Sequence, residues 1–410
     1  MNSLRRSRLR PAFVLVAAAL ALAGCSLTGR STQPQPPPPA PPPVQEPELV
    51  PVPPPQAVTP APAPVPANGK IEVAIILPLS GANAAIGQAL LNAAQMALFD
   101  GGSEQLQLLV RDSGGTATTA AAAAHAAIDA GARLILGPLL AAEVEAAKPV
   151  AAGANVPMIA FSNTISLAGG GTWLLGFDPR QEIERVVVYA HAHGRNNFAA
   201  LAPSSPYGDI AVAALKQSAQ LAGASVGTVS RYDPATTDFG TAVKAFAAAA
   251  NNPDAVLIPE GGTKLRSIAS LLAFNSIDPD KVKFLGTGLW ADQSLGSEPS
   301  LEGGWYAAPA PQTRADFEAR YKSLYQADPP FLATLGYDAA ALAAVLAKAQ
   351  PGGDFSAGAI TNPNGFSGLN GIFRLRADGV AERGLAVLEV HRAGSTVIDP
   401  APQSFAKPGY

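Results

Sequence analysis

Residues 71–98 read IEVAIILPLSGANAAIGQALLNAAQMAL, and this stretch decides the fold. Its first seven residues form a β-branched apolar run that is typical of a buried strand. Apolar residues then recur at helical spacing, at Ala85, Ile86, Ala89, Leu90, Ala93 and Ala97. A buried strand followed by such a helix predicts the first half of a βαβ unit, and therefore a parallel sheet.

Further strand and helix pairs follow along the chain. We expect strands at residues 106–111, 133–136 and 157–161, with helices at 116–130 and 141–152. The segment TWLLGFDPRQEIERVVVYAHAHG (172–194) predicts a strand and then a helix that begins at Asp178-Pro179. After it we expect strands at 197–202, 225–232, 255–259 and 282–286, with helices at 210–222, 239–249 and 264–274. These two series predict an α/β fold with two doubly wound parallel-sheet lobes.

The C-terminal third has a different pattern. Helices expected at residues 314–326 and 331–348 have no strand pattern between them, so they return to cover an existing sheet. Residues 371–375 and 385–391, joined by Asp378-Gly379, predict a β-hairpin, with a last strand at 396–398. We therefore divide the globular part into lobe 1 (70–178 and 291–350), lobe 2 (179–290) and a C-terminal β segment on lobe 2 (351–410).

The N-terminus carries an export signal. Residues 5–10 are rich in arginine and precede a short apolar run that ends in small residues, so residues 1–24 are expected to be removed. Leu22-Ala23-Gly24-Cys25 resembles the bacterial lipobox, which implies lipidation of Cys25, and Ser26 after it favours the outer membrane, facing the periplasm. An ordinary signal peptide with a chance cysteine is the alternative.

Residues 25–69 are expected to form a lipidated, flexible tether. The stretch from 31 to 68 is dominated by Pro and Ala and has no apolar periodicity. Polyproline geometry rises ~3.1 Å per residue, which gives a reach on the order of 100 Å. The membrane is therefore contacted through the N-terminal lipid only.

Charge and cysteine usage exclude several classes. The four arginines of the export signal, Arg5, Arg6, Arg8 and Arg10, leave with it, and the net charge falls from −3 to −7. A mildly acidic body argues against nucleic acid as a partner. Cys25 is the only cysteine, which excludes a disulfide framework and a thiolate metal cluster.

The chain resembles the type I periplasmic-binding-protein superfamily over most of residues 70–400. The matching motifs are the opening strand and helix, Leu136-Gly137-Pro138, VPMIAFSNT (156–164) and Pro206-Tyr207-Gly208. The resemblance implies two lobes joined by hinge crossovers that close on a ligand. Within the superfamily the chain is most similar to the LppC or LpoA-type lipoproteins, activators of penicillin-binding proteins. That likeness rests on ILGPLLAAEVEAAKPVA (135–151) and on the segments 176–194 and 201–209. Enterobacterial members of that branch carry a helical-repeat domain where this chain has only its Pro-rich segment.

Loops at the C-terminal ends of parallel strands converge on a crevice, where helix N-termini offer free N–H groups. The residues expected there are Ser80, Gly81, Gly137, Pro138, Ser162, Asn163 and Thr164 from lobe 1, and Tyr207, Glu260 and Trp290 from lobe 2. For each residue alone, turn chemistry or helix capping is the slightly simpler explanation. Taken together, these residues favour a ligand-binding crevice.

Two functions remain open for such a module. The first is a non-catalytic regulator that binds a peptidoglycan synthase (a penicillin-binding protein), with or without a small molecule in the cleft. The alternative is the solute-binding receptor of an ABC importer for amino acids or related small polar ligands. Residues 139–142 (LLAA) offer no hydroxyl and 286–289 (GTGL) no carboxylate, so the usual amino-acid anchor looks degraded, although Ser162, Thr164 and Glu260 could compensate. We therefore favour the regulator.

The sequence does not point to an enzyme. It contains no G-x-S-x-G, P-loop or H-E-x-x-H motif. His191 and His193 are two residues apart on a predicted helix, so they point away from each other and do not predict a metal site. Asp112 and Glu260 lie at strand ends, where capping explains them more simply than paired-carboxylate catalysis. We expect no cofactor, metal or catalytic residue.

Overall fold

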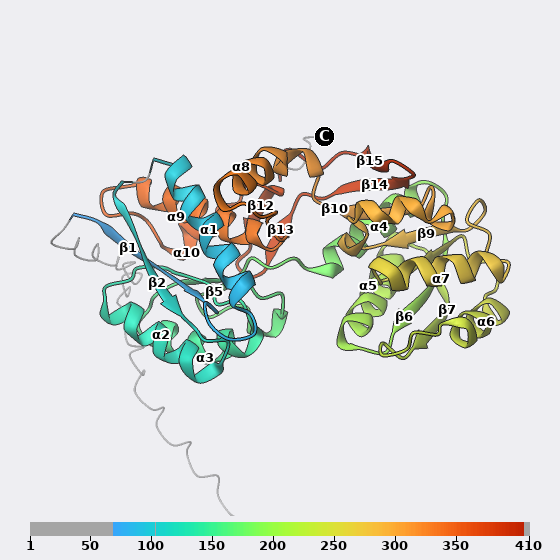
Figure 1. The fold of residues 1–410 in the computed structure, drawn as a ribbon, viewed down its shortest axis with the longest axis horizontal. Helices are drawn as coiled ribbons and strands as arrows, with labels where there is room; N and C mark the ends of the chain where they lie inside the picture. Colours follow the sequence, from blue (N-terminus) through green and yellow to red (C-terminus); the bar gives the residue numbers. More distant parts are fainter. Residues whose placement is uncertain (1–68, 103, 406–410) are drawn as a thin grey trace, which may run out of the picture. The chain divides into compact units, whose positions relative to one another are not determined.

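The computed structural model describes residues 69–102 and 104–405. The predicted export signal, Cys25 and all of the predicted tether except Gly69 lie outside the described residues. The described part contains a parallel sheet, a mixed sheet in which β14 (Ala386–His391) and β15 (Gly394–Asp399) are antiparallel additions to parallel strands, and a small antiparallel sheet (Figure 1).

The first sheet has the strand order β2-β1-β3-β4-β5, and all its pairings are parallel. Its elements are β1 (Ile71–Leu77), α1 (Ala84–Asp100), β2 (Leu106–Asp112), α2 (Ala117–Asp129), β3 (Ile135–Leu136), α3 (Ala141–Gly153), β4 (Met158–Ala160) and β5 (Thr172–Leu174). Alternate residues of β1 enter two cores: Val73 and Ile75 pack with α1, and Ala74 and Ile76 pack with α2 and α3. This is why the opening strand is apolar on both faces.

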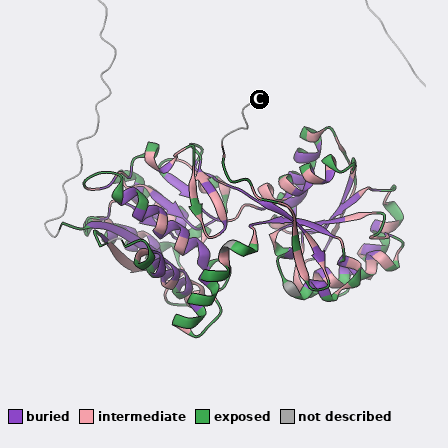
Figure 2. Ribbon diagram, turned by 90° about the horizontal axis from the view of Figure 1, so that it is seen from above, coloured by how far each residue is buried: buried purple, intermediate pink, exposed green. Residues whose placement is uncertain are grey.

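The second sheet has the order β15-β14-β10-β9-β8-β6-β7. Its elements are α4 (Pro179–Ala192), β6 (Asn197–Pro203), α5 (Pro206–Ala222), β7 (Ser225–Tyr232), α6 (Gly240–Ala249), β8 (Ala255–Leu257), α7 (Gly262–Phe274), β9 (Lys283–Gly286), β10 (Trp305–Ala308), β14 (Ala386–His391) and β15 (Gly394–Asp399). One core joins α4 and α5 to this sheet, and a second core joins α6 and α7 to its other face. The buried strands between partly exposed helices are visible in Figure 2. Two doubly wound lobes are thus confirmed.

The remaining elements complete lobe 1. They are α8 (Ala315–Tyr325), α9 (Ala333–Lys348), α10 (Ala357–Ile360), β11 (Phe366–Gly368), β12 (Gly371–Leu375) and β13 (Ala381–Arg383). Helix α9 packs along α1, and Phe317 and Tyr321 of α8 pack in a core with α1 residues. Short 3-10 turns lie at Ile165–Leu167, Gly288–Trp290, Gln293–Ser297, Pro299–Leu301 and Pro311–Arg314. The chain therefore crosses between lobes three times: between β5 and α4, between β10 and α8, and between β13 and β14.

The C-terminal β segment differs from the prediction. The turn at Asp378-Gly379 joins β12 to β13, and β14 pairs instead with β10 and β15 in the second sheet. Strands β11–β13 form their own sheet, whose Phe373 and Leu375 enter the core of lobe 1. The predicted hairpin of residues 371–375 with 385–391 was therefore wrong. Alternation of apolar and polar residues shows that one face of a strand is buried, but it does not show which strand is the pairing partner.

Two further differences have local causes. The strand β10 was not predicted, because WYAA is only four residues long and all four are buried, so it shows no period of two. Helix α5 begins at Pro206, four residues earlier than expected. Ser205 caps it by accepting a hydrogen bond from the Gly208 N–H at 3.2 Å, and proline is well suited to the first helical position.

Candidate ligand-binding site

A cavity of about 520 Å³ lies where the chain passes between the lobes. The crossover between β5 and α4 contributes Phe177, Pro179 and Glu182, and the one between β10 and α8 contributes Ala308, Pro309, Arg314 and Glu318. Lobe 1 adds Asn163, Pro329, Phe331 and Leu332, and lobe 2 adds Tyr207, Gly288, Leu289, Ala291 and Asp292. The lining is mostly apolar with a few charged groups, as is usual for small-molecule sites.

Glu182 stands in the first turns of α4 and lines this cavity. Asp178 caps the helix by accepting a hydrogen bond from the Arg180 N–H, and Pro179 occupies the first position. Glu182 Oε2 accepts a hydrogen bond of 2.9 Å from the backbone N–H of Gly288. Burial raises the pKa of Glu182 to about 7, and the negative charge of Asp178 adds to that rise, while the Gly288 N–H and Arg383 oppose it. The carboxyl is thus poised between its two protonation states at neutral pH.

The loop after β9 fits closely around Glu182. A side chain at Gly288 would place its Cβ 2.7 Å from Glu182 Oε1, so only glycine leaves room for the carboxylate there. Next to Gly288, the buried hydroxyl of Thr287 lies 2.8 Å from the Tyr207 hydroxyl. Burial raises the pKa of Tyr207, so the phenol stays protonated.

The rings of Phe177 and Phe331 form one wall of the cavity, and an arginine side chain lies over each ring. The rings of Phe177 and Phe331 stack with their centroids 4.5 Å apart and an interplanar angle of 29°. Arg314 lies over Phe331 at 4.9 Å from the ring centroid, and Arg383 lies over Phe177 at 4.5 Å. Each guanidinium interacts with the electron-rich face of a ring, so the four side chains stabilise one another.

Arg314 is the cation that lines this cavity. Its Nε lies 3.3 Å from Glu318 Oε1, and its Nη1 donates a 3.4 Å hydrogen bond to Asn370 Oδ1. The side chain is 12% exposed. Among the described residues, Nη2 has no hydrogen-bond partner, so Arg314 keeps donor capacity for an anionic group.

Behind the aromatic wall lies a buried ion pair. Arg383 Nη1 is 3.8 Å from Asp338 Oδ2, and their side chains are 3% and 0% exposed. Arg383 Nη2 also donates to the carbonyl of Leu175, and Asp338 Oδ1 accepts from the backbone N–H of Leu369. Burial raises the pKa of Asp338 to about 6 and lowers that of Arg383. The pair fixes the guanidinium that supports Phe177.

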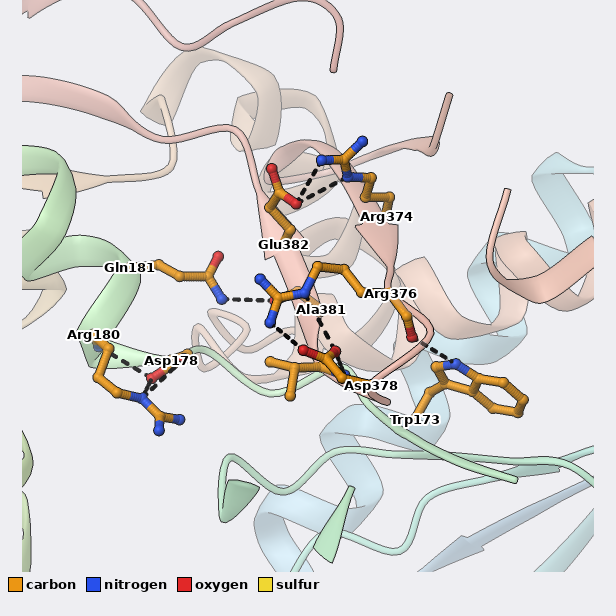
Figure 3. A network of polar contacts seen from close by, with 10 residues as sticks. Trp173, Asp178, Arg180, Gln181, Arg374, Arg376, Asp378, Ala381 and Glu382 are labelled. Carbon is orange, nitrogen blue, oxygen red and sulfur yellow. Dashed lines mark hydrogen bonds and ion pairs between the residues drawn. The ribbon is translucent and has the colours of Figure 1, made fainter. Parts of the chain in front are cut away.

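The hinge is held on its other side by a polar network (Figure 3). The side-chain amide of Gln181 donates to the carbonyl of Ala381 at 2.6 Å and accepts from the Arg383 N–H at 3.0 Å. Trp173 Nε1 donates to the carbonyl of Arg376 at 3.1 Å. Helix α4 of lobe 2 is therefore bonded to the strand that leads into the third crossover.

Of the ten cleft residues that the sequence suggested, Asn163 and Tyr207 line this cavity. Asn163 Nδ2 donates to the carbonyl of Phe177, which ties the loop after β4 to the first crossover. The other lobe 1 candidates follow their strands as expected but do not line the cavity: Ser80, Gly81, Gly137, Pro138, Ser162 and Thr164. Gly137 and Pro138 are buried, and Ser162 accepts a hydrogen bond from the Thr164 N–H within its own turn.

Two lobe 2 candidates have other roles. Trp290 is fully buried, packs in a core of the second sheet and donates from Nε1 to the carbonyl of Ile258, so its assignment to the cleft was wrong. An aromatic residue just after the end of a strand often contacts a ligand. Here the 3-10 turn Gly288–Trp290, which follows β9, directs the Trp290 side chain into the core instead. Glu260 accepts a 2.7 Å hydrogen bond from the Tyr232 hydroxyl and does not line the cavity.

The residues that the sequence did not suggest come chiefly from the crossovers. Glu182, Arg314 and Phe331 lie at the starts of helices or just before them, whereas the residues predicted from the sequence follow strand ends. The usable signal was the Asp178-Pro179 helix start, because a helix that begins directly after a crossover presents its first turns to the hinge.

Within residues 69–102 and 104–405, no group of three or more His, Cys, Asp or Glu side chains is arranged to hold a metal ion. None of the helices in that same part of the chain combines the length and the apolar character that crossing a membrane requires.

Comparison with known families identifies the fold. A family model described as periplasmic binding protein matches residues 70–395. The chain belongs to the periplasmic binding protein family. Membership implies a periplasmic location, and it places the chain in a class of solute-binding proteins. No curated protein matches the chain.

Solved structures of this family share the fold at low sequence identity. A putative branched-chain amino acid ABC transporter protein from Rhodospirillum rubrum is 20% identical, with a TM-score of 0.72, covering 80% of this chain and all of that one. A leucine-binding protein from Thermotoga maritima is 21% identical, with a TM-score of 0.57, covering 81% and 98%. A solute-binding protein of an ABC transporter from Rhodopseudomonas palustris, in complex with 3,4-dihydroxybenzoic acid, is 19% identical, with a TM-score of 0.61, covering 83% and 98%.

These comparisons correct the functional prediction. The family and the similar structures are substrate-binding proteins of ABC transporters, so the expectation of a peptidoglycan-synthase activator was wrong. The expected protein partner, a penicillin-binding protein, falls with it, because proteins of this kind bind small ligands and serve a transporter. The expectation of a degraded amino-acid anchor failed because Glu182 and Arg314 come from the crossovers, whereas it concerned residues 139–142, which do not line the cavity, and 286–289, of which Gly288 and Leu289 do.

Proposed function

We propose that this chain is the solute receptor of an ABC importer and binds an amino acid or a related small polar molecule without chemically changing it. The observation that carries the proposal is the cavity at the crossovers, which presents Glu182 and Arg314 beside an apolar wall. A ligand with charged groups gives up its hydration on binding, and this is tolerable only where opposite charges or hydrogen-bonding groups replace the water.

The apolar part of the lining supports the same proposal. Leu289 is 48% exposed, Phe331 42% and Leu332 38%, and these residues come from both lobes. Large apolar side chains that remain exposed inside a cavity gain free energy when a ligand covers them or when the lobes close over it. A small organic solute with an apolar portion suits this lining.

The test is a binding screen with the purified residues 69–410. Differential scanning fluorimetry against the protein amino acids, benzoate, 3,4-dihydroxybenzoate and short polyamines would be followed by calorimetry on each hit. A saturable ligand with one site per chain supports the proposal, and Arg314→Ala should weaken an anionic ligand at least tenfold. If none of these compounds shifts the melting temperature, or if a bound compound is converted to a product, the proposal is wrong.

We further propose that Cys25 is lipidated and that residues 25–69 form a tether to the membrane. The lipobox-like sequence 22–25 and the Pro-rich composition after it support this. Replacing Cys25 with Ser should release the protein from the membrane fraction. Density-gradient separation of the two membranes of the native cell then tests retention at the outer membrane, for which Ser26 is the sequence signal.

A further inference from the structure

Three carboxylates line the cavity, and they differ in how far their oxygens are already bonded. Glu318 pairs with Arg314. Asp292 accepts hydrogen bonds from the Ser294 N–H at 2.8 Å and the Ser294 hydroxyl at 2.9 Å, one on each oxygen. Glu182 uses Oε2 for the Gly288 N–H, and among the described residues its Oε1 has no hydrogen-bond partner.

Resting on the proposed function, we propose that Glu182 determines the specificity of the cavity: Oε1 accepts a hydrogen bond from a cationic nitrogen of the ligand, and the ligand is therefore an amine. The Tyr207 hydroxyl lines the same cavity and offers a second acceptor, since an oxygen engaged with Thr287 retains a lone pair. Arg314 would receive the carboxylate of a zwitterionic amine. An amine-free carboxylate would use only Arg314 and leave Glu182 without a partner.

Proton uptake and release follow from this placement. With a pKa of about 7 in the empty cavity, Glu182 holds a proton on a large fraction of molecules at neutral pH. A cation beside Oε1 favours the ionised carboxylate, so binding of an amine expels that proton. At pH 6 only about one molecule in ten is ionised, against about nine in ten at pH 8, and the dissociation constant of an amine should therefore rise about tenfold between pH 8 and pH 6.

Other charged groups face Glu182 from every side, and they must be kept apart from it in the experiment. Asp178 lies at the start of the same helix, and Arg383 approaches from β13, paired with Asp338. Tyr207 comes from α5 with Glu260 beyond it, and Asp292 and the Arg314–Glu318 pair line the remaining cavity. Asp338 also titrates near neutrality, with a pKa of about 6, so a pH effect alone does not identify Glu182.

The experiment is calorimetry at pH 6 and pH 8 with matched probes. L-leucine, its deamino analogue 4-methylpentanoate and its decarboxylated analogue 3-methylbutylamine share one carbon skeleton, and equivalent sets serve for any other amino acid found in the screen. Wild type is compared with Glu182→Gln, which keeps the size and the Gly288 hydrogen bond but removes the charge. Glu184→Gln, on the exposed side of the same helix, is the matched control. Asp338→Asn removes the second carboxyl that titrates near neutrality, so any pH dependence that remains in this variant does not come from Asp338.

We expect amine-bearing probes to bind about tenfold more tightly at pH 8 than at pH 6. Proton release should appear as an apparent binding enthalpy that changes with the ionisation enthalpy of the buffer. Glu182→Gln should weaken them at least tenfold and abolish the pH dependence, while Glu184→Gln retains it. Tight binding of the deamino analogue, or amine binding that Glu182→Gln leaves unchanged, overturns this inference but leaves the receptor function standing. If no probe binds at all, both proposals fail together.

Discussion

Asp338 and Arg383 form an ion pair 3.8 Å apart that is buried behind the ligand cavity. Asp338 comes from α9 and Arg383 from the strand that leads into the third crossover, so the pair joins the core of lobe 1 to the hinge. Among the described residues, Asp338 Oδ2 and Arg383 Nε and Nη1 have no hydrogen-bond partner. A buried pair with such incomplete hydrogen bonding adds little net stability, but losing one partner leaves an uncompensated charge.

Asp338→Ala should therefore destabilise the protein by about 3–5 kcal/mol, because Arg383 remains buried without its counter-ion. Urea unfolding followed by circular dichroism measures the change. Asp328→Ala removes one partner of an exposed ion pair, with Lys322, and is expected to have almost no effect. Equal effects of the two variants would show that Arg383 reaches water or another anion.

The pH dependence of stability gives an independent test of Glu182. Its pKa is raised in the folded protein, from 4.5 to about 7, so the folded state binds more protons between these values and its stability falls as the pH rises through them. Glu182→Gln removes this loss. Relative to wild type, the variant should gain up to about 3 kcal/mol at pH 8 over its value at pH 4.5. A relative stability that does not change with pH would mean that the carboxyl is well solvated.

Gly288→Ala tests the close fit around the same carboxylate. The new Cβ would lie 2.7 Å from Glu182 Oε1, so the side chain must turn away and its hydrogen bond with the Gly288 N–H is lost. We expect a cost of about 1–3 kcal/mol, together with weaker binding of amines. In Gly227→Ala, on β7, the nearest atom is 3.4 Å from the new Cβ, so that variant should be neutral or slightly stabilised.

Much of the fold could be predicted from the sequence because the core of each lobe produces a recognisable pattern of apolar residues along its strands and helices. In β1, residues of both parities are apolar, which predicts a strand buried on both faces, and the structure places them in two cores. The pattern within a strand does not show which other strand it pairs with. Strands β12 and β14 both follow turn residues, yet β12 joins the small sheet on lobe 1 and β14 the edge of the second sheet.

The site was harder to predict for a related reason. The rule that ligands meet the C-terminal ends of parallel strands led to Asn163 and Tyr207, which line the cavity, and also to Trp290, which does not. Glu182 and Arg314 lie beyond the crossovers, and only the three-dimensional path of the chain brings them together. The same rule cannot tell a loop residue that faces the ligand from one that folds back into the core.

Replacing Trp290 should therefore lower the stability of the protein, whereas the sequence had suggested that it would weaken ligand binding. Its ring is fully buried and packs directly against Gly286, where an added Cβ would overlap the indole. Trp290→Phe loses the hydrogen bond to the Ile258 carbonyl and leaves a void, and Trp290→Ala should cost about 3–5 kcal/mol in unfolding free energy. Calorimetry on the folded fraction should show a smaller change in ligand affinity than Gly288→Ala causes; the reverse order would place the indole in the cavity.

The stacked rings of Phe177 and Phe331 offer a last test, because they join the first crossover to the segment before α9. A double-mutant cycle with Phe177→Ala, Phe331→Ala and both together should give a coupling free energy of about 0.5–1.5 kcal/mol in urea unfolding. Phe331 is 42% exposed in the cavity, so its removal should also weaken ligand binding. The coupling should fall when Arg383 is replaced by Met, because the guanidinium over Phe177 holds that ring against its partner. Additive single effects would mean that the two rings contribute to the wall separately and that the crossover is positioned by the Gln181 hydrogen bonds alone.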